Sequence, residues 1–165
     1  AHPAISTYWK EIEETIRLAF YTPGTHPCRR VKIRRSGSWL RIGLPSGREL
    51  CYPQIDVDED GTISYVGHNT YTRQWGKVVS YGGKFYENIV QAGAADQFIE
   101  CFPIIEAAGF QIVVHVHDEV VAETPIECED LSVEKLGLLM CSSLGWNKGL
   151  PLAAAGFTTQ RYRKD

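Results

Sequence analysis

The sequence predicts an α+β fold with an antiparallel sheet, and three observations support this class. Residues 3–20 place apolar side chains every three to four positions, as an amphipathic helix does. Residues 29–66 contain short β-branched runs separated by turns rich in Gly, Pro and Ser, a pattern typical of antiparallel strands. Residues 85–108 return to helical spacing, and a short β-branched hairpin follows them. Helices grouped apart from strands favour the α+β class over alternating α/β units.

The first helix is expected to bury Ile12 and Ile16 and to end near Pro23 and Gly24, which interrupt helical structure. The β-rich part that follows should contain strands at residues 30–34, 39–42 and 49–52. In the first of these strands basic and β-branched residues alternate, so the basic side chains should face outward. These outward basic side chains can be interpreted in two ways. They are either simply solvated, which the pattern slightly favours, or they contact phosphates.

Residues 56–64 match the first half of a calcium-binding EF-hand loop, including Gly61 and Ile63. The motif needs a bidentate Glu at its last position, where this chain has Gly67, and it needs flanking helices that the sequence does not predict. An acidic hairpin tip explains the segment better. A strand is expected at residues 62–66, with a short connecting element at residues 71–75.

The second helix is predicted from Phe85 to Ala108, after flexible backbone at residues 81–84. Pro103 should kink its last turns, and Gly109 should end it. Its apolar stripe is expected to contain Ile89, Ala92, Ala95, Ile99, Phe102 and Ile105.

The C-terminal part predicts one more amphipathic helix at residues 131–144. Residues 150–155 are predicted to form a final strand, and residues 159–164 a basic tail.

The segment from Ile112 to Glu123 carries the strongest functional signal. Two β-branched runs flank His117, Asp118 and Glu119, which predicts a hairpin with its acidic residues at the turn. Burial of the flanking strands would hold the two carboxylates rigidly at a sheet edge. Such a pair suits Mg²⁺, which takes one or two protein carboxylates together with substrate phosphates. The alternative is an ordinary solvated turn, because Asp is common in turns.

Composition sets broader limits on function. The chain has 165 residues and a net charge of −3, with no apolar run near the ~20 residues that a membrane span needs. No secretory signal is visible, and the five scattered cysteines form neither a disulfide framework nor a zinc motif, which favours the cytoplasm. Residues 29–48 contain seven basic residues and no acid, whereas residues 100–134 contain nine acids and no Lys or Arg. This distribution suits a protein that handles a polyanion with a metal, although a pI near 6 argues against tight nucleic-acid binding by this chain alone.

Four blocks of sequence, in order along the chain, resemble the C-terminal part of a family A (DNA polymerase I-type) DNA polymerase, most closely the bacteriophage versions. The likeness covers essentially the whole chain. The blocks are Gly47–Pro53, similar to G-R-x-L-x-x-P; Tyr81–Lys84 with Glu87–Ala92, similar to Y-G-G-K and E-N…Q-A, continued by Ala94–Asp96; Val116–Glu119, identical to the palm motif V-H-D-E; and Leu150–Leu152 with the Gly156 tail.

The resemblance implies a palm-type antiparallel sheet with a central carboxylate hairpin, and template-directed nucleotidyl transfer from a dNTP to a primer 3′ end. Two Mg²⁺ ions, or Mn²⁺ in their place, would activate the attacking oxygen and stabilise the leaving one. In this family Asp118 would be one of two palm carboxylates that bind metal, Glu119 a second acid beside it, and His117 a neighbour of the primer end. Gln91, and with it Lys84 and Arg48, would contact primer–template DNA.

Two parts of the family pattern have no match in this chain. They are the palm strand of the D-Y-S-Q-I-E type, which carries the other carboxylate, and the fingers helix that binds the triphosphate. The expectation is therefore that residues 1–165 form a C-terminal palm portion, with residues 29–66 as a β insertion, and that it is inactive alone. It would work with an upstream part of the same longer chain or with a separate subunit, in the cytoplasm of a host cell and without a membrane partner.

Two other functions fit some of the residues. A strand carrying His115, His117 and Asp118 resembles the metal cluster of a Zn or Mn hydrolase, although no second histidine cluster accompanies it. A non-catalytic nucleic-acid-binding or scaffolding module would use the basic residues Arg30, Lys32 and Arg34 instead.

Overall fold

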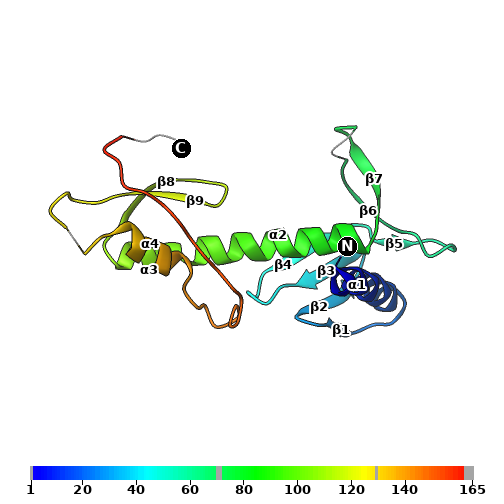
Figure 1. The fold of residues 1–165 in the computed structure, drawn as a ribbon. Helices are drawn as coiled ribbons and strands as arrows, with labels where there is room; N and C mark the ends of the chain where they lie inside the picture. Colours follow the sequence, from blue (N-terminus) through cyan, green and yellow to red (C-terminus); the bar gives the residue numbers. More distant parts are fainter. Residues whose placement is uncertain (1, 70–71, 129, 162–165) are drawn as a thin grey trace. The chain divides into compact units, whose positions relative to one another are not determined.

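The computed structural model describes residues 2–69, 72–128 and 130–161, and it divides the chain into two compact units, residues 1–93 and 94–165. The α+β class with antiparallel sheets is confirmed (Figure 1). In the part of the chain that is described, no helix is both long and apolar enough to cross a membrane. The elements are α1 (Pro3–Tyr21), β1 (Thr25–Cys28), β2 (Val31–Ser36), β3 (Trp39–Gly43), β4 (Glu49–Tyr52), β5 (Asp56–Val57), β6 (Ile63–His68), β7 (Trp75–Ser80), α2 (Gly82–Glu100), α3 (Phe102–Ala107), β8 (Gln111–Val116), β9 (Glu119–Glu123) and α4 (Val133–Met140).

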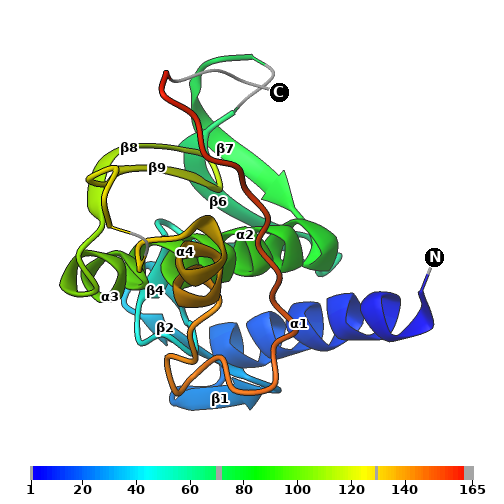
Figure 2. The same ribbon diagram turned by 60° about the vertical axis from the view of Figure 1, so that its left-hand side comes forward.

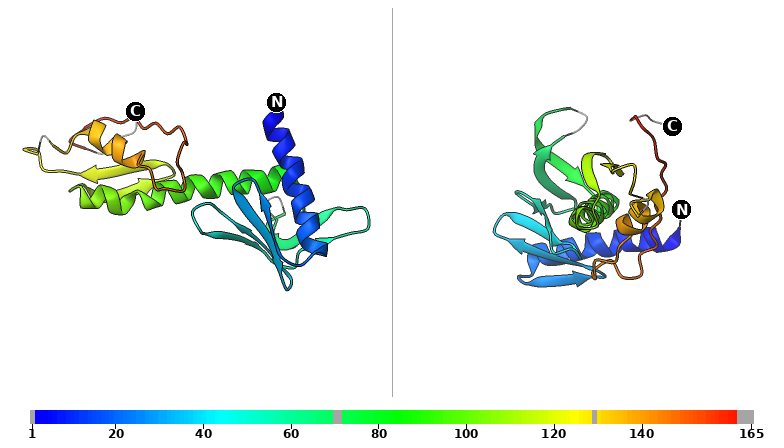
Figure 3. Two further views of the ribbon diagram at one scale, coloured as in Figure 1. Left: turned by 90° about the horizontal axis from the view of Figure 1, so that it is seen from below. Right: turned by 90° about the vertical axis from the view of Figure 1, so that its left-hand side faces the viewer.

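The first sheet has the strand order β1-β2-β3-β4, with every pair antiparallel. Helix α1 packs on one face of this sheet (Figure 3). Alternation along the strands turns their apolar side chains toward the helix, as predicted. The fully buried core residues here include Ile12, Ile16, Ile33, Leu40 and Ile42.

Strand β1 was not predicted. Its sequence, T-H-P-C, lacks β-branched alternation and contains Pro27, so no pattern marks it as a strand. It lies at the edge of the sheet, where a residue without a backbone N–H is tolerated.

The second sheet has the order β5-β6-β7 and contains the predicted acidic hairpin tip. Asp58 Oδ1 accepts a hydrogen bond of 2.8 Å from the backbone N–H of Thr62, which closes the turn. Gly61 has a φ of +79°, a conformation that favours glycine. Strand β7 was missed, because Gly76 and the exposed Trp75 and Val79 leave no clear apolar face in its sequence. Residues 70 and 71, part of the predicted connection, lie outside the described residues.

Helix α2 begins earlier than predicted, and the long helix is broken rather than kinked. Gly82 and Gly83, expected to be flexible, form its first turn. The chain leaves the helix at Cys101, and α3 starts with Pro103 in its first turn, where a missing N–H costs nothing. The predicted apolar stripe is wrong at Ala95 and Ile99, which are exposed while Asp96 and Gln97 are buried, but Ile105 at its end is buried as predicted.

In the second unit a buried amide network joins α2 to the loop after α4. The Asn147 side-chain amide donates to Gln97 Oε1 and, at 3.0 Å, to the carbonyl of Ser142, and its oxygen accepts from the Leu144 N–H at 2.8 Å. Gln97 Nε2 donates in turn to the carbonyl of Met140 at 3.4 Å. Buried amides of this kind stabilise a loop only while their partners are satisfied.

The substitution Asn147→Ala should therefore lower the free energy of unfolding by about 2 kcal/mol, because it leaves buried partners without hydrogen bonds. Urea denaturation followed by circular dichroism measures this change. Ser143→Ala, at an exposed position of the same loop, serves as the control and should stay within about 0.5 kcal/mol of the wild type. Equal stability of the two variants would contradict a structural role for the network.

The C-terminal segment differs most from the prediction. Helix α4 is shorter than residues 131–144 and starts after Ser132, whose hydroxyl accepts a hydrogen bond from the Lys135 N–H. The predicted strand at residues 150–155 is wrong, because the segment is exposed and pairs with no strand in the described chain. It runs instead past α4, with Ala154 near Gly137. Of the predicted basic tail, residues 162–164 lie outside the described residues.

Tyr52 is the centre of an aromatic cluster in the first unit. Its ring meets those of Tyr65 and Phe85 edge to face at centroid distances of 4.9 and 5.0 Å, and its hydroxyl accepts a 3.0 Å hydrogen bond from Asn88 Nδ2. Burial raises the pKa of Tyr52 to about 12.

Because this pKa lies above the usual value near 10, the buried neutral hydroxyl contributes stability that is complete below about pH 10 and is lost as the pH rises toward 12. Wild-type protein should lose stability over this range, and Tyr52→Phe should lose less. Denaturation at stepped alkaline pH, with tyrosinate absorbance recorded in parallel, tests this. Identical pH profiles for both proteins would refute it.

Candidate functional site

The predicted carboxylate hairpin is present, and its turn is as short as a hairpin allows. Val116 pairs with Glu119, so His117 and Asp118 alone form the loop between β8 and β9. His117 has a φ of +56°, which is uncommon for a residue other than glycine. Two-residue hairpin loops require such a conformation to match the strand twist. The sequence thus places Asp118 and Glu119 at the tip of a tightly constrained turn.

The base of the hairpin is fixed by the core of the second unit. Figure 2 shows the chain passing from α3 directly to β8. Gly109, with a φ of +102°, and the buried Phe110 form this connection. Phe110 packs with Cys101 and Ile105. The ring centroid of His115 lies 5.3 Å from that of Phe102, edge to face, although His115 as a whole is exposed.

The expectation that both flanking strands are buried is wrong. The hairpin forms a two-stranded sheet of its own, with an irregularity between Ile112 and Val114. Val113 is 46% and Val114 is 42% exposed, and of the hairpin's residues Ile112 and Ala122 pack on the core of the second unit. Two-stranded sheets need a further packing surface for rigidity.

Asp118 and Glu119 are both exposed, so their carboxylate oxygens are accessible to a cation. Within the described residues no three His, Cys, Asp or Glu side chains form a group that could bind a metal. Two adjacent carboxylates nevertheless fit the donor chemistry of Mg²⁺, whose other ligands are commonly water and substrate phosphates. The hydrolase alternative gains no further ligand for His115 and His117 from the residues that the structure describes.

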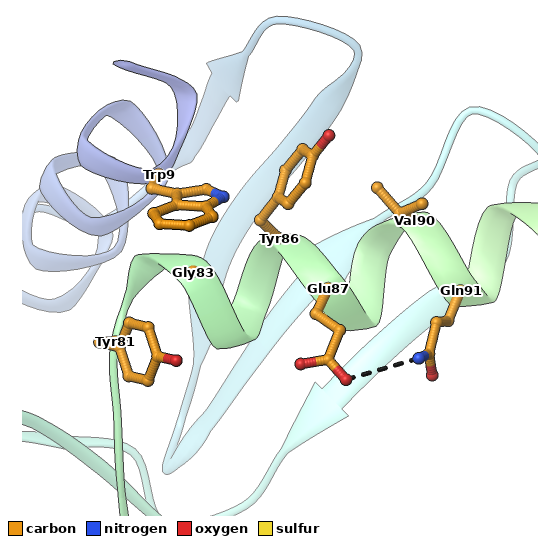
Figure 4. A pocket seen from close by; sticks show the side chains of 7 residues that line it. All are labelled: Trp9, Tyr81, Gly83, Tyr86, Glu87, Val90 and Gln91. Carbon is orange, nitrogen blue, oxygen red and sulfur yellow. Dashed lines mark hydrogen bonds between the residues drawn. The ribbon is translucent and has the colours of Figure 1, made fainter. Parts of the chain in front are cut away.

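Gln91 lies in a different place, at an open hollow of about 490 Å³ in the first unit. Figure 4 shows Trp9 of α1 facing Tyr86 of α2, with Tyr81 just before the helix. The Trp9 and Tyr86 rings are 6.4 Å apart. Partly exposed aromatic rings beside an amide offer surfaces for stacking and hydrogen bonding at once.

A polar chain borders this hollow along one face of α2. Lys84 Nζ lies 3.0 Å from Glu87 Oε2, and Gln91 Nε2 donates to Glu87 Oε1 at 3.4 Å (Figure 4 draws the second bond). Glu87 therefore contacts both of the predicted DNA-binding residues of this helix. The spacings of three and four residues explain the contacts, since such residues are neighbours on a helix.

Arg48 has a structural contact. It leaves the turn before β4 and donates a 2.9 Å hydrogen bond to the carbonyl of Ala92 on α2. The bond holds the Leu44–Gly47 turn against the helix next to Gln91. The structure thus brings Arg48, Lys84 and Gln91 to the same helix, while His117, Asp118 and Glu119 belong to the second unit.

Sequence reasoning missed the aromatic residues of the hollow. Helical periodicity predicts only whether Trp9 and Tyr86 face the core or the solvent. It does not predict that the two rings meet, because their contact depends on how α1 packs on α2. One available signal was the Gly82-Gly83 pair, because adjacent small residues permit close helix approach.

The chain is 40% identical over 131 residues to a DNA polymerase of Bacillus phage SP02. The match covers 76% of this chain and 20% of the phage protein, so the chain spans about a fifth of the length of the polymerase that it matches. A comparison with protein-family models found no match. No solved structure matched the chain either.

Proposed function

We propose that residues 1–165 form the C-terminal palm portion of a family A DNA polymerase, with residues 29–66 as a β insertion. The observation that carries the proposal is the two-residue turn that presents Asp118 beside Glu119, in a chain similar to part of a phage DNA polymerase. The reaction would be template-directed transfer of a nucleotide from a dNTP to a primer 3′ end.

In this proposal Asp118 and Glu119 hold Mg²⁺, with Asp118 as the principal ligand and His117 beside the primer end. Bound Mg²⁺ supplies charge neutralisation at the attacking and leaving oxygens of the in-line displacement. The contribution of this chain is positional. The two-residue turn fixes where the two carboxylates leave the backbone, and the exposed two-stranded hairpin would gain the rest of its rigidity from a further packing surface.

The same proposal assigns the α2 hollow to the DNA. Gln91 would contact the primer–template duplex near its end, with Lys84 and Arg48 close to the phosphates. Minor-groove acceptors are alike in all correct base pairs, so an amide donor there tests pairing geometry without reading sequence. Because Glu87 contacts Lys84 and Gln91, DNA would have to compete with that carboxylate for both side chains.

The proposed enzyme is incomplete in this chain. Two carboxylates from one hairpin do not make a two-metal site, and the triphosphate needs cationic residues that the family carries on its fingers helix. We therefore propose a partner part, upstream in the same longer chain or separately encoded, that supplies the second palm carboxylate and the fingers. The host-cell cytoplasm remains the expected location, in line with the free cysteines among the described residues.

Primer extension in a reconstituted system tests the function. This chain would be combined with the polypeptide encoded immediately upstream in its source, either mixed with it or joined to it, and given primed template, dNTPs and Mg²⁺. Extension by the combination and not by either part alone is the expected result. A folded combination that binds primed template but does not extend it would overturn the catalytic proposal and leave a nucleic-acid-binding module.

A further inference from the structure

We infer that the outward face of the β1–β4 sheet is a binding surface for single-stranded nucleic acid. The surface, called the outer sheet face below, consists of Lys32, Arg34, Trp39 and Arg41. It lies in the first unit, away from the α2 hollow in sequence, and does not depend on catalysis by the hairpin.

Strand alternation assembles this face. Val31, Ile33, Leu40 and Ile42 are buried toward α1, so the residues between them on β2 and β3 must point the other way. Register then sets the neighbours: Arg34 pairs with Arg41, Ser36 with Trp39, and Lys32 with Gly43. Three cations and an indole therefore share one side of two adjacent strands.

The two arginines are held in place by one carboxylate. Glu49 on β4 accepts from Arg34 Nη2 at 2.9 Å and from Arg41 Nη1 at 3.0 Å. These guanidinium groups hold the pKa of Glu49 below its usual range. One acid against three cations leaves the face positive, and it reduces the mobility of two long side chains before any ligand arrives.

Two other arginines of this region, Arg29 and Arg35, have different roles, which defines the limits of the face. Arg29 donates to Glu11 on α1, and Arg35 stacks on Phe20 at 4.4 Å and donates to its carbonyl. Both side chains thus fasten β2 and the preceding turn to the helix. Arg41 differs, since it lies on the outward side and donates from Nη1 to Glu49, while its buried Nε has no hydrogen-bond acceptor among the described residues.

Beside the cations the surface is hollowed. An open depression of about 540 Å³ is lined by three cations and one acid, Arg30, Lys32, Arg34 and Glu49, together with Thr25 and the turn around Pro45. Gly43, opposite Lys32, contributes no side chain to fill it. A concave cationic surface of this size suits phosphate groups of a chain, which attract Lys and Arg regardless of sequence.

Trp39 selects a single strand over a duplex. It is 42% exposed and lies two residues from Arg41 on the same strand, about 7 Å along it. An exposed indole next to cations stacks well on a nucleobase. Base faces are free in a single strand and are covered by neighbouring pairs within a duplex, so a single strand makes use of both Trp39 and the arginines.

Binding of a fluorescently labelled oligothymidylate to the full chain, measured by anisotropy at several salt concentrations, tests the inference without metal, dNTP or partner polypeptide. Trp39→Ala should weaken binding roughly tenfold or more. Lys32→Gln should lower the slope of log affinity against log salt by about 0.7, the value of one lost phosphate contact with a single strand. Glu49→Gln should tighten binding, because it removes the negative charge from the outer sheet face while its amide oxygen can still accept from Arg34 and Arg41.

Two control variants remove the same types of side chain, a tryptophan and a cation, at positions outside the outer sheet face. Trp75→Ala removes an exposed tryptophan from the other sheet, and Arg29→Gln removes an arginine that faces α1; both should leave affinity unchanged. Circular dichroism establishes that each variant is folded. The inference fails if Trp39→Ala and Trp75→Ala bind equally well, or if a duplex of equal length binds as tightly as the single strand. Success or failure here is separate from primer extension, which depends on Asp118.

Discussion

Asp118→Ala is expected to slow primer extension by roughly a thousandfold or more in the reconstituted polymerase, with little change in DNA affinity. Such a loss corresponds to about 4 kcal/mol of transition-state stabilisation, a reasonable contribution from a metal-binding carboxylate. Asp118→Asn should have a similar effect, because it keeps the shape of the side chain and removes its charge. Rapid-quench measurement of single-nucleotide incorporation, together with the Kd for primed template, separates the chemical step from binding.

Glu123→Gln is the matched control for this experiment. Glu123 is an exposed acid on the same hairpin, at the end of β9 far from the turn, where it pairs with Gln111. Its loss should leave extension within about twofold, since surface changes away from a site have small effects. Extension by Asp118→Ala within tenfold of the wild type would refute the metal-ligand role, and equal losses in both variants would point to general destabilisation of the hairpin.

Gly82→Ala is expected to lower the free energy of unfolding of the first unit by about 3 kcal/mol. A Cβ at Gly82 would lie 2.0 Å from the backbone oxygen of Trp9, a distance that forces α1 and α2 apart. Forced repacking of this kind costs about 1–3 kcal/mol and sometimes more. Urea denaturation followed by tryptophan fluorescence measures the change, because Trp9 lies at the contact.

Gly93→Ala, in the same helix, provides the control. A Cβ at Gly93 meets nothing within 4 Å, so the better helix propensity of alanine should stabilise the protein by up to about 1 kcal/mol. The two Gly→Ala changes should therefore shift stability in opposite directions. A stabilised Gly82→Ala protein would mean that the two helices are not packed at Trp9.

Strong periodicity explains which elements were predictable. Helix α1 and strands β2 and β3 have uninterrupted apolar spacing, and their partners lie close in sequence. Strands β1 and β7 pair with neighbouring strands through hydrogen bonds. The sequence of β1, T-H-P-C, contains no pattern that predicts this pairing. The buried Gln97 shows the opposite failure, since a polar residue enters the core only when distant groups such as Asn147 satisfy it.

In the candidate site, too, features set by neighbouring residues in the sequence were predictable, and features set by packing were not. The acidic turn was predictable because Asp118 and Glu119 are adjacent in sequence, between two β-branched runs. The contact of Glu87 with Lys84 and Gln91 could have been predicted from helical spacing alone. The meeting of Trp9 with Tyr86 could not, because it depends on how two helices pack.

The two-residue turn at His117 and Asp118 makes the length of the hairpin as important as its composition. One residue deleted there would shift β9 by one position and exchange its two faces. Glu123 would then take the place opposite Ile112 that belongs to Ala122, which packs on the core of the second unit. Burying an unpaired carboxylate is far more costly than losing an exposed one. A single-residue deletion in this loop is thus penalised by folding itself, before any effect on metal binding.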